Sequence, residues 1–216
     1  MPVDQWLLDL EVFCADVGSI AQSKFAWARR HPTAEGEEVH APASIDSLAT
    51  AITHQLACAQ PVALGFEMPL VIPVPPAPND LGKARPCDQG RTPWSQSVGA
   101  SVMATGLVQL AWVLDQVLTA VPAAAIHLDW SRFCADRSGL FLWEAFVNGP
   151  DKDPNGSHEA DALIGVRALC DQLPDPGDPR AREIQRPLSL AAAAALWAGW
   201  PLDLGQLRAS IAVVRP

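Results

Sequence analysis

The sequence predicts a mixed α/β domain. The short, continuously apolar run Val62–Phe66 is typical of a strand buried on both faces of a sheet, and Leu140–Phe146, which is apolar apart from Glu144, predicts a second buried strand. Two longer segments, Val98–Ala120 and Glu159–Leu173, carry the apolar patterns of helices. Because strands and helices alternate along the chain, we expect residues 1–216 to form a single α/β domain.

Composition supports a well-buried globular core and limits the partners. Of the 216 residues, 49% are hydrophobic and 18% are charged. The net charge of −9 opposes unaided binding to long nucleic acid, whose affinity depends on Lys and Arg. This negative charge is compatible with binding of a nucleotide, a short or structured nucleic acid, or a divalent metal. The five cysteines form no Cys-x-x-Cys pair, so neither a zinc ribbon nor a disulfide framework is expected.

The N-terminal region predicts a hairpin followed by a helix. The runs Leu8–Asp16 and Lys24–Arg30 are separated by a segment that carries Gly and Ser, and a third strand is expected at Glu37–His40. Ser44 stands at the N-cap position of an apolar helical pattern that extends to Ala59.

Prolines interrupt every periodic pattern between Met68 and Trp94. Seven of the chain's 20 prolines lie in Pro69–Pro93. Proline cannot donate to a sheet ladder and restricts the residue before it, so we expect an ordered or semi-ordered loop and no strand. Loops this long inside a compact domain are usually functional or mobile, and the position directly after Glu67 favours function.

Basic and aromatic residues of this loop form a candidate substrate clamp. A positive loop flanked by an aromatic residue suits a phosphate or a nucleobase, through charge-assisted hydrogen bonds and stacking. The alternative is that its arginines pair with acidic residues and hold the loop down. The candidate substrate-binding residues are Lys83, Arg85, Asp88, Arg91 and Trp94.

A C-terminal addition follows the predicted core, which spans about residues 8–173. Residues 174–216 comprise a polar connector, an Ala-rich helix at Leu188–Trp197 and a strand at Ile211–Arg215. The apolar stretch Ala100–Ala120 contains Gln and Asp side chains, and the C-terminal apolar stretch is too short to span a bilayer. We therefore expect buried helices, a cytoplasmic protein and no membrane partner, while a homodimer or a partner protein stays open.

Three carboxylates stand where separate elements would deliver them to one point. Asp16 and Glu67 each end an apolar strand, and Asp161 lies at the start of a predicted helix. Acids at the carboxyl ends of two strands, faced by a helix N-terminus, suit a Mg²⁺ or Mn²⁺ site. His158 lies one helical turn before Asp161 on the same face, where it could orient water or shuttle a proton. Glu144, on a later strand, is a further candidate ligand.

Each of these residues also has a simpler explanation. Asp16 beside a glycine could shape a turn, and Asp161 is favoured in a first helical turn by the helix dipole. His158 could be a cap or a surface residue. Glu67 is the strongest candidate, because a lone Glu at the end of a buried strand is costly unless it is paired or bound to metal.

Four short motifs, in this order, resemble those of ribonuclease H-like folds. The resemblance extends to the branch that includes RuvC-type Holliday-junction resolvases and, more closely, to a widespread family of uncharacterised bacterial proteins predicted to share that fold. It covers about residues 8–173 and implies a mixed sheet flanked by helices, with metal-dependent nuclease activity. The motifs are Glu67-Met-Pro-Leu70, Arg85-Pro-Cys-Asp88, a late strand bearing Glu144, and His158-Glu-Ala-Asp-Ala162.

Three functions are therefore under consideration. The first is a metal-dependent nuclease or phosphodiesterase that acts on a small substrate or on one delivered by a partner. The second is a catalytically silent nucleotide-binding or regulatory module of the same fold. The third is a partner-binding scaffold that uses Trp197, Trp200 and the Ala-rich helix.

Overall fold

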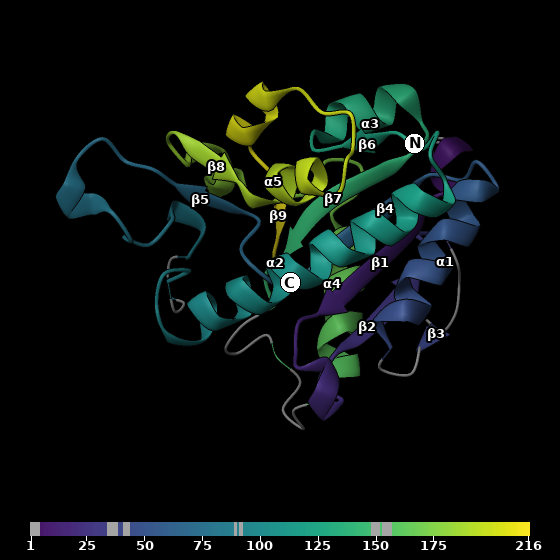
Figure 1. The fold of residues 1–216 in the computed structure, drawn as a ribbon, viewed down its shortest axis with the longest axis horizontal. Helices are drawn as coiled ribbons and strands as arrows, with labels where there is room; N and C mark the ends of the chain where they lie inside the picture. Colours follow the sequence, from purple (N-terminus) through teal and green to yellow (C-terminus); the bar gives the residue numbers. More distant parts are fainter. Residues whose placement is uncertain are drawn as a thin grey trace.

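One mixed sheet with helices on both faces forms the centre of the molecule (Figure 1). The computed structural model describes residues 5–33, 39–40, 44–88, 90, 93–147, 152 and 157–216. Its strands are β1 (Glu11–Asp16), β2 (Ala26–Arg30), β3 (Val39–His40), β4 (Val62–Phe66), β6 (Ile126–His127), β7 (Leu140–Ala145) and β9 (Val213–Val214). They lie in the order β3-β2-β1-β4-β7-β6, and β9 also pairs with β7.

Strand directions confirm the predicted hairpin and the two buried strands. β1 pairs with β2 in antiparallel orientation, with Asp16 opposite Ala26, and β2 pairs with β3 in the same way. β1, β4 and β7 run parallel to one another. Parallel strands place their carboxyl ends at the same edge of the sheet, so the residues that end β1 and β4 are neighbours.

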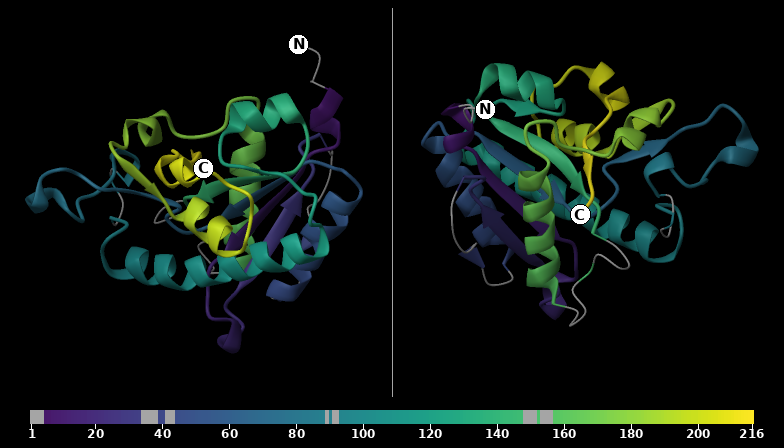
Figure 2. Two further views of the ribbon diagram at one scale, coloured as in Figure 1. Left: turned by 45° about the horizontal axis from the view of Figure 1, so that its top comes forward. Right: turned by 180° about the vertical axis from the view of Figure 1, so that it is seen from behind.

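Helices cover the sheet in two layers, which are seen from opposite sides in Figure 1 and in the right view of Figure 2. One apolar cluster joins the sheet to α1 (Ile45–Ala57), α2 (Ser97–Ala120) and α5 (Leu190–Trp197). A second cluster joins the other face to α3 (Trp130–Asp136) and α4 (His158–Asp171). Burial on both faces explains why β4 and β7 are apolar throughout most of their length.

Serine caps begin three of these helices. The predicted cap Ser44 accepts a hydrogen bond from the backbone N–H of Ser47 at 3.3 Å. Ser157 and Ser189 cap α4 and α5 in the same way. Each cap satisfies a donor that has no partner within its helix.

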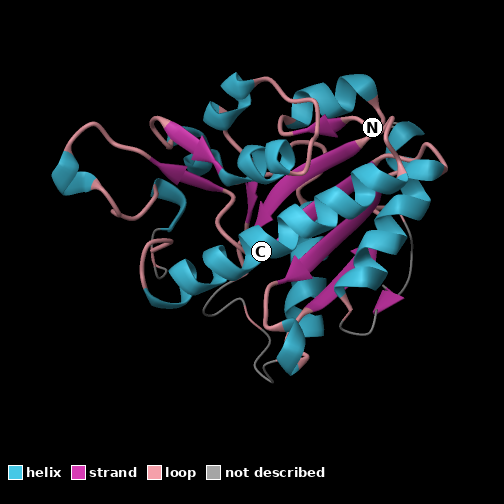
Figure 3. Ribbon diagram, viewed as in Figure 1, coloured by secondary structure: helices cyan, strands magenta, loops and turns pink. Residues whose placement is uncertain are grey.

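The proline-rich segment contains a strand, contrary to the prediction. β5 (Val71–Pro73) pairs in antiparallel orientation with β8 (Pro187–Ser189), forming the small separate sheet in Figure 3. Both strands of a two-stranded sheet are edges, where a missing N–H is tolerated. Prolines therefore excluded a central strand here but not a short edge strand.

The C-terminal residues are integrated into the domain more closely than an addition implies. β9 runs parallel to β7, with Val213 opposite Glu144, and α5 packs against α2. Trp200 is buried, and its Nε1–H donates to the carbonyl of Leu114 at 3.1 Å. Trp197, by contrast, is 72% exposed. The two tryptophans of the scaffold hypothesis thus have different environments.

α2 covers the sheet with one face only. Leu110, Val113 and Val117 are buried, whereas Val98 and Val108 are exposed. By length and composition alone the helix could cross a membrane, but core helices of soluble proteins pass the same test. The prediction of a buried helix is therefore correct for one face of α2.

Candidate metal centre

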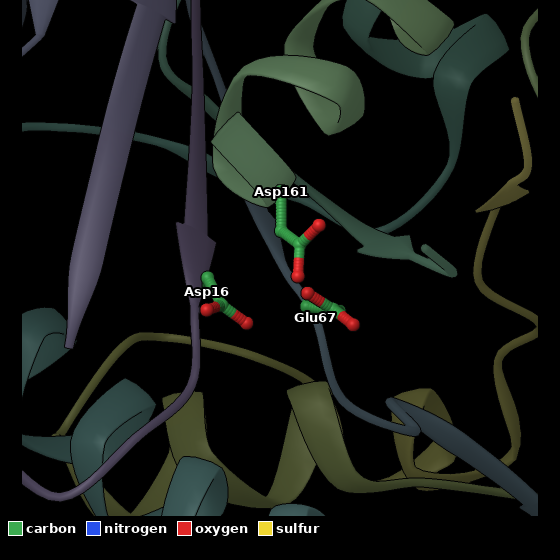
Figure 4. Close-up of side chains that lie close together, drawn as sticks. All are labelled: Asp16, Glu67 and Asp161. Atoms are coloured by element: carbon green, nitrogen blue, oxygen red, sulfur yellow. The ribbon is translucent and has the colours of Figure 1, made fainter. Parts of the chain in front are cut away.

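Asp16, Glu67 and Asp161, here called the acid cluster, come together at one edge of the sheet. Asp16 is the last residue of β1, Glu67 follows β4, and Asp161 lies in the first turn of α4. One carboxylate oxygen from each lies within 4.8 Å of the others. Figure 4 shows the three side chains converging from these elements.

Register and side-chain alternation place Asp16 and Glu67 side by side on the α4 face. Ala15 pairs with Phe66, so the next residues along the parallel strands are Asp16 and Glu67. The N–H of Glu67 donates to the carbonyl of Ala15 at 2.8 Å, which extends the ladder to this point. Cys14, two residues before Asp16, packs in the apolar cluster beneath α4.

A glycine brings the N-terminal half of α4 close to β1. A Cβ added at Gly165 would lie 2.4 Å from the Sγ of Cys14, a distance that side chains do not tolerate. Gly165 is one turn after Asp161, so the same close approach carries Asp161 to the strand ends. Asp161 is 4% exposed there.

Glu67 is strongly perturbed by its surroundings. The pKa of Glu67 is raised to about 10: burial is the largest cause, the hydrogen bond and charge of the adjacent Asp16 add to it, and Lys152 opposes the shift. The Asp16–Glu67 pair therefore holds a proton at neutral pH. The Oε2 of Glu67 is buried and has no hydrogen-bond partner in the described parts of the chain. A buried oxygen left unpaired is costly, which favours a ligand at this point.

His158 is positioned by Asp16. Its Nδ1 contacts the Oδ2 of Asp16, and its side chain is 40% exposed. With the proton on Nδ1, the imidazole donates to the carboxylate and leaves Nε2 as an acceptor. The predicted pairing of a histidine with this cluster is thus present in the geometry.

Lys152 joins the acid cluster, and sequence reasoning missed it. Its Nζ lies 3.1 Å from the Oε1 of Glu67 and 2.9 Å from the Oδ2 of Asp161. The available signal was weak: a lysine nine positions before Asp161, in the polar segment between β7 and α4. Contact between this lysine and the strand ends depends on the tertiary fold.

Two positive charges, the Lys152 ammonium and a bound proton, offset the negative charge of the acid cluster. Burial alone would lower the pKa of Lys152, but the charge of Glu67 and the hydrogen bond to Asp161 raise it above its ordinary value. The shifts of Lys152 and Glu67 belong to one coupled group. A proton on the Asp16–Glu67 pair and the positive charge of Lys152 together offset the carboxylates.

Glu144 lies outside the acid cluster, which corrects its prediction as a metal ligand. It pairs in register with Phe66, whose side chain is in the apolar cluster under α1, α2 and α5. Residues paired across a ladder point to the same face, so Glu144 points away from Glu67. Its carboxylate instead accepts from Arg85 at 2.7 and 2.8 Å and from the N–H of Leu70 at 2.8 Å.

Arg85, Asp88 and Glu144 form a buried ion-pair group, here called the Arg85 cluster. Every nitrogen of the Arg85 guanidinium is engaged: Nε donates to Asp88 at 2.9 Å, and Nη1 also donates to the carbonyl of Val71 at 2.9 Å. The side chains of all three members are fully buried. Arg85 and Asp88 therefore hold the loop in place, as the alternative to substrate binding supposed.

The other three residues of the predicted clamp differ in their surroundings. Trp94 lines a cavity that Asp16 and Glu67 also line, and its Nε1–H donates to the carbonyl of Lys83 at 3.0 Å. The Lys83 ammonium is exposed and pairs with Asp80 at 2.6 Å. Arg91 lies outside the described residues.

A cavity of about 210 Å³ opens beside the acid cluster. Its charged and polar lining residues are Asp16, Glu67, Arg85, Lys152 and His158. The rest of the lining is largely apolar, and part of it comes from the N-terminal turns of α2. The apolar lining includes Met68, Trp94, Val98, Val102, Phe146 and Val147.

No protein-family model, curated protein or solved structure matches this chain. The chemistry of the residues therefore carries the functional argument. Three carboxylates suit the oxygen preference of Mg²⁺ and Mn²⁺. Cys14 is close, but burial raises its pKa well above the ordinary value, which keeps the thiol protonated and unsuited to a soft metal.

Proposed function

We propose that this protein is a metal-dependent nuclease or phosphodiesterase with a ribonuclease H-like fold. The observation that carries the proposal is the convergence of three carboxylates from two parallel strand ends and a helix N-terminus to within 4.8 Å. The unpaired Oε2 of Glu67 supports a ligand at that point. Asp16, Glu67 and Asp161 would hold Mg²⁺ or Mn²⁺.

The sheet supports the fold assignment. The element order on which the sequence resemblance rests is present, with an antiparallel β1–β2–β3 unit followed by parallel β4 and β7. Two acids of the resemblance end β1 and β4, and the His-x-x-Asp-Ala motif begins α4. The motif bearing Glu144 contributes to the Arg85 cluster instead.

Each residue of the site has a distinct proposed role. The bound metal would activate water and neutralise charge on the scissile phosphate. His158, oriented through Nδ1 by Asp16, presents Nε2 to take a proton from attacking water or to return one to the leaving group. Burial of Asp16 and Asp161 holds their oxygens in place before substrate arrives.

Charge and cavity size restrict the proposed substrate. The chain carries a net charge of −9, which disfavours long duplexes. The cavity of about 210 Å³ suits a small group beside the reacting phosphate. A nucleotide, or an exposed end of a short or structured nucleic acid, fits both observations.

Cleavage assays with a paired control test the proposal. Purified protein with Mn²⁺ is offered RNA, DNA and cyclic nucleotides, and Glu67→Gln is compared with Glu11→Gln, at the opposite end of β1. We expect Glu67→Gln to lose at least about a hundredfold in rate, because one charged ligand is removed. Glu11→Gln should keep wild-type activity. Equal rates for wild type and Glu67→Gln would sink the proposal.

Lys152 favours a second candidate function, a catalytically silent nucleotide-binding module. The ammonium already supplies positive charge to Glu67 and Asp161, so the cluster can be stable without metal. In this case calorimetry would detect nucleotide binding in the absence of Mn²⁺, and addition of Mn²⁺ would not lead to cleavage. Absence of nucleotide binding with and without metal removes this option.

A further inference from the structure

The ammonium of Lys152 occupies the gap that a metal shared by Glu67 and Asp161 would need. Nζ is 3.1 Å from one carboxylate oxygen and 2.9 Å from the other. Mg²⁺ bonded to the same two oxygens would lie about 2.1 Å from each, closer than the ammonium does. Because the ammonium contacts both oxygens and carries like charge, the two cations cannot be held there together.

We propose that Lys152 is a built-in competitor of the metal and sets which cations the site accepts. This inference rests on the proposed metal site. In the metal-free protein the ammonium fills the gap, and an entering metal displaces it. A monovalent ion would replace one single charge by another and lose two charge-assisted hydrogen bonds. A divalent ion brings more charge to the same oxygens, so Lys152 favours divalent over monovalent ions.

Burial differs between the lysine and its partners in the way displacement requires. The side chain of Lys152 is 41% exposed, whereas those of Glu67 and Asp161 are 13% and 5% exposed. The ammonium can therefore move into water by rotation of its own flexible side chain. The two carboxylates stay in place, because Glu67 is held directly after β4 by the sheet and Asp161 is held in the first turn of α4 by the helix.

Calorimetric titration with Mn²⁺ tests the inference without any assay of activity. The variants are Lys152→Met and Lys152→Gln, which remove the charge, and Lys152→Arg, which keeps it. Lys24→Met, on an exposed lysine, is the matched control for net charge. We expect both neutral variants to bind Mn²⁺ about tenfold more tightly or better, because the competing charge is gone. Lys152→Arg and Lys24→Met should bind like the wild type.

A second titration tests discrimination between cations. In wild type, adding K⁺ should barely affect Mn²⁺ binding, whereas Lys152→Met and Lys152→Gln should lose Mn²⁺ affinity as K⁺ rises, at an ionic strength held constant. Circular dichroism verifies that each variant is folded before titration.

The possible outcomes separate this inference from the proposed function. If the wild type and the neutral variants bind Mn²⁺ equally, or the variants bind it more weakly, Lys152 is no competitor although the metal site stands. Binding by the neutral variants alone supports strong competition. If no form binds Mn²⁺, both this inference and the metal-dependent activity fail.

Discussion

The acid cluster and the Arg85 cluster both bury carboxylates, and their acids Glu67 and Glu144 point to opposite faces of the same sheet. In the Arg85 cluster, both oxygens of Glu144 accept hydrogen bonds and all three side chains are fully buried. In the acid cluster, the Oε2 of Glu67 has no partner in the described structure, and Lys152, which contacts the Oε1 of Glu67, has a side chain that is 41% exposed. The acid cluster also has a histidine, His158, which contacts Asp16 and lines the cavity.

The contrast shows that hydrogen-bond saturation is more informative than burial. A buried acid whose acceptors are all used by fixed partners holds elements together. One that keeps a free acceptor beside a displaceable cation can exchange partners, which binding and catalysis require. By this criterion Glu67 is a candidate functional residue and Glu144 is an architectural one.

The largest expected effect is on stability, from Arg85→Met. The substitution leaves Asp88 and Glu144 without their buried counter-charge and should lower the free energy of unfolding by about 3–5 kcal/mol. Urea unfolding followed by circular dichroism measures it. Arg182→Met, which breaks an exposed pair with Asp175, should cost less than about 1 kcal/mol. Equal losses in the two variants would show that the Arg85 cluster is not architectural.

A smaller effect is expected from Gly165→Ala, which moves α4 away from β1. The added Cβ would meet the Sγ of Cys14, so the free energy of unfolding should fall by about 1–3 kcal/mol. Asp161 would move with the helix, and Mn²⁺ affinity should fall as well. Adding Cys14→Ala removes the clash and should restore part of both quantities. A single variant with unchanged stability and affinity would contradict the role of this close approach.

The pH dependence of metal binding comes next in size. Because the pKa of Glu67 is raised to about 10, metal must displace a proton at neutral pH. Mn²⁺ affinity should therefore rise with pH, by up to about tenfold per unit between about pH 6 and 8. Calorimetry in buffers of different ionisation enthalpy counts the released proton. If Mn²⁺ affinity is constant or falls as pH rises, the Asp16–Glu67 pair does not hold the proton that metal must displace.

The smallest effect is expected from Glu67→Gln on stability. Gln resembles the protonated acid, so at pH 7 the variant should be within about 1 kcal/mol of the wild type or more stable. Because the pKa of Glu67 is raised from 4.5 to about 10 in the folded state, protonation of Glu67 stabilises the fold fully below pH 4.5, and this stabilisation is lost as the pH rises toward about 10. The free energy of unfolding of the wild type should therefore fall relative to that of the variant over this pH range. Glu144→Gln should destabilise at every pH. If Glu67→Gln lowers the free energy of unfolding more than Glu144→Gln does, Glu67 is the architectural residue of the two.

Local pattern was sufficient for most elements of the fold. β4 begins and ends where its apolar run does, and α1, α2, β7 and α4 lie within a few residues of their predicted ranges. The short elements β6 and α3 were missed, because two strand residues and two helical turns carry too little periodicity. β5 was rejected because its proline excluded a central strand, whereas its actual partner makes it an edge strand.

The candidate site was predictable in part. Strand-end positions predicted that Asp16, Glu67 and Asp161 would meet, and they do. The face to which Glu144 points depends on its register with Phe66, which no local pattern reveals. Its partner Arg85 is 59 residues away in the chain.

The sequence by itself determined the longer elements, the Ser44 cap and which acids stand at strand ends, because apolar period and capping chemistry act within a few residues. Only the tertiary structure decided how each buried acid is satisfied: Glu144 by Arg85, and Glu67 in part by Lys152. The physical reason is that hydrogen-bond partners are chosen by distance in space. A lysine in a polar connector and an arginine in a proline-rich loop become partners once packing has set the register of the sheet and the approach of α4.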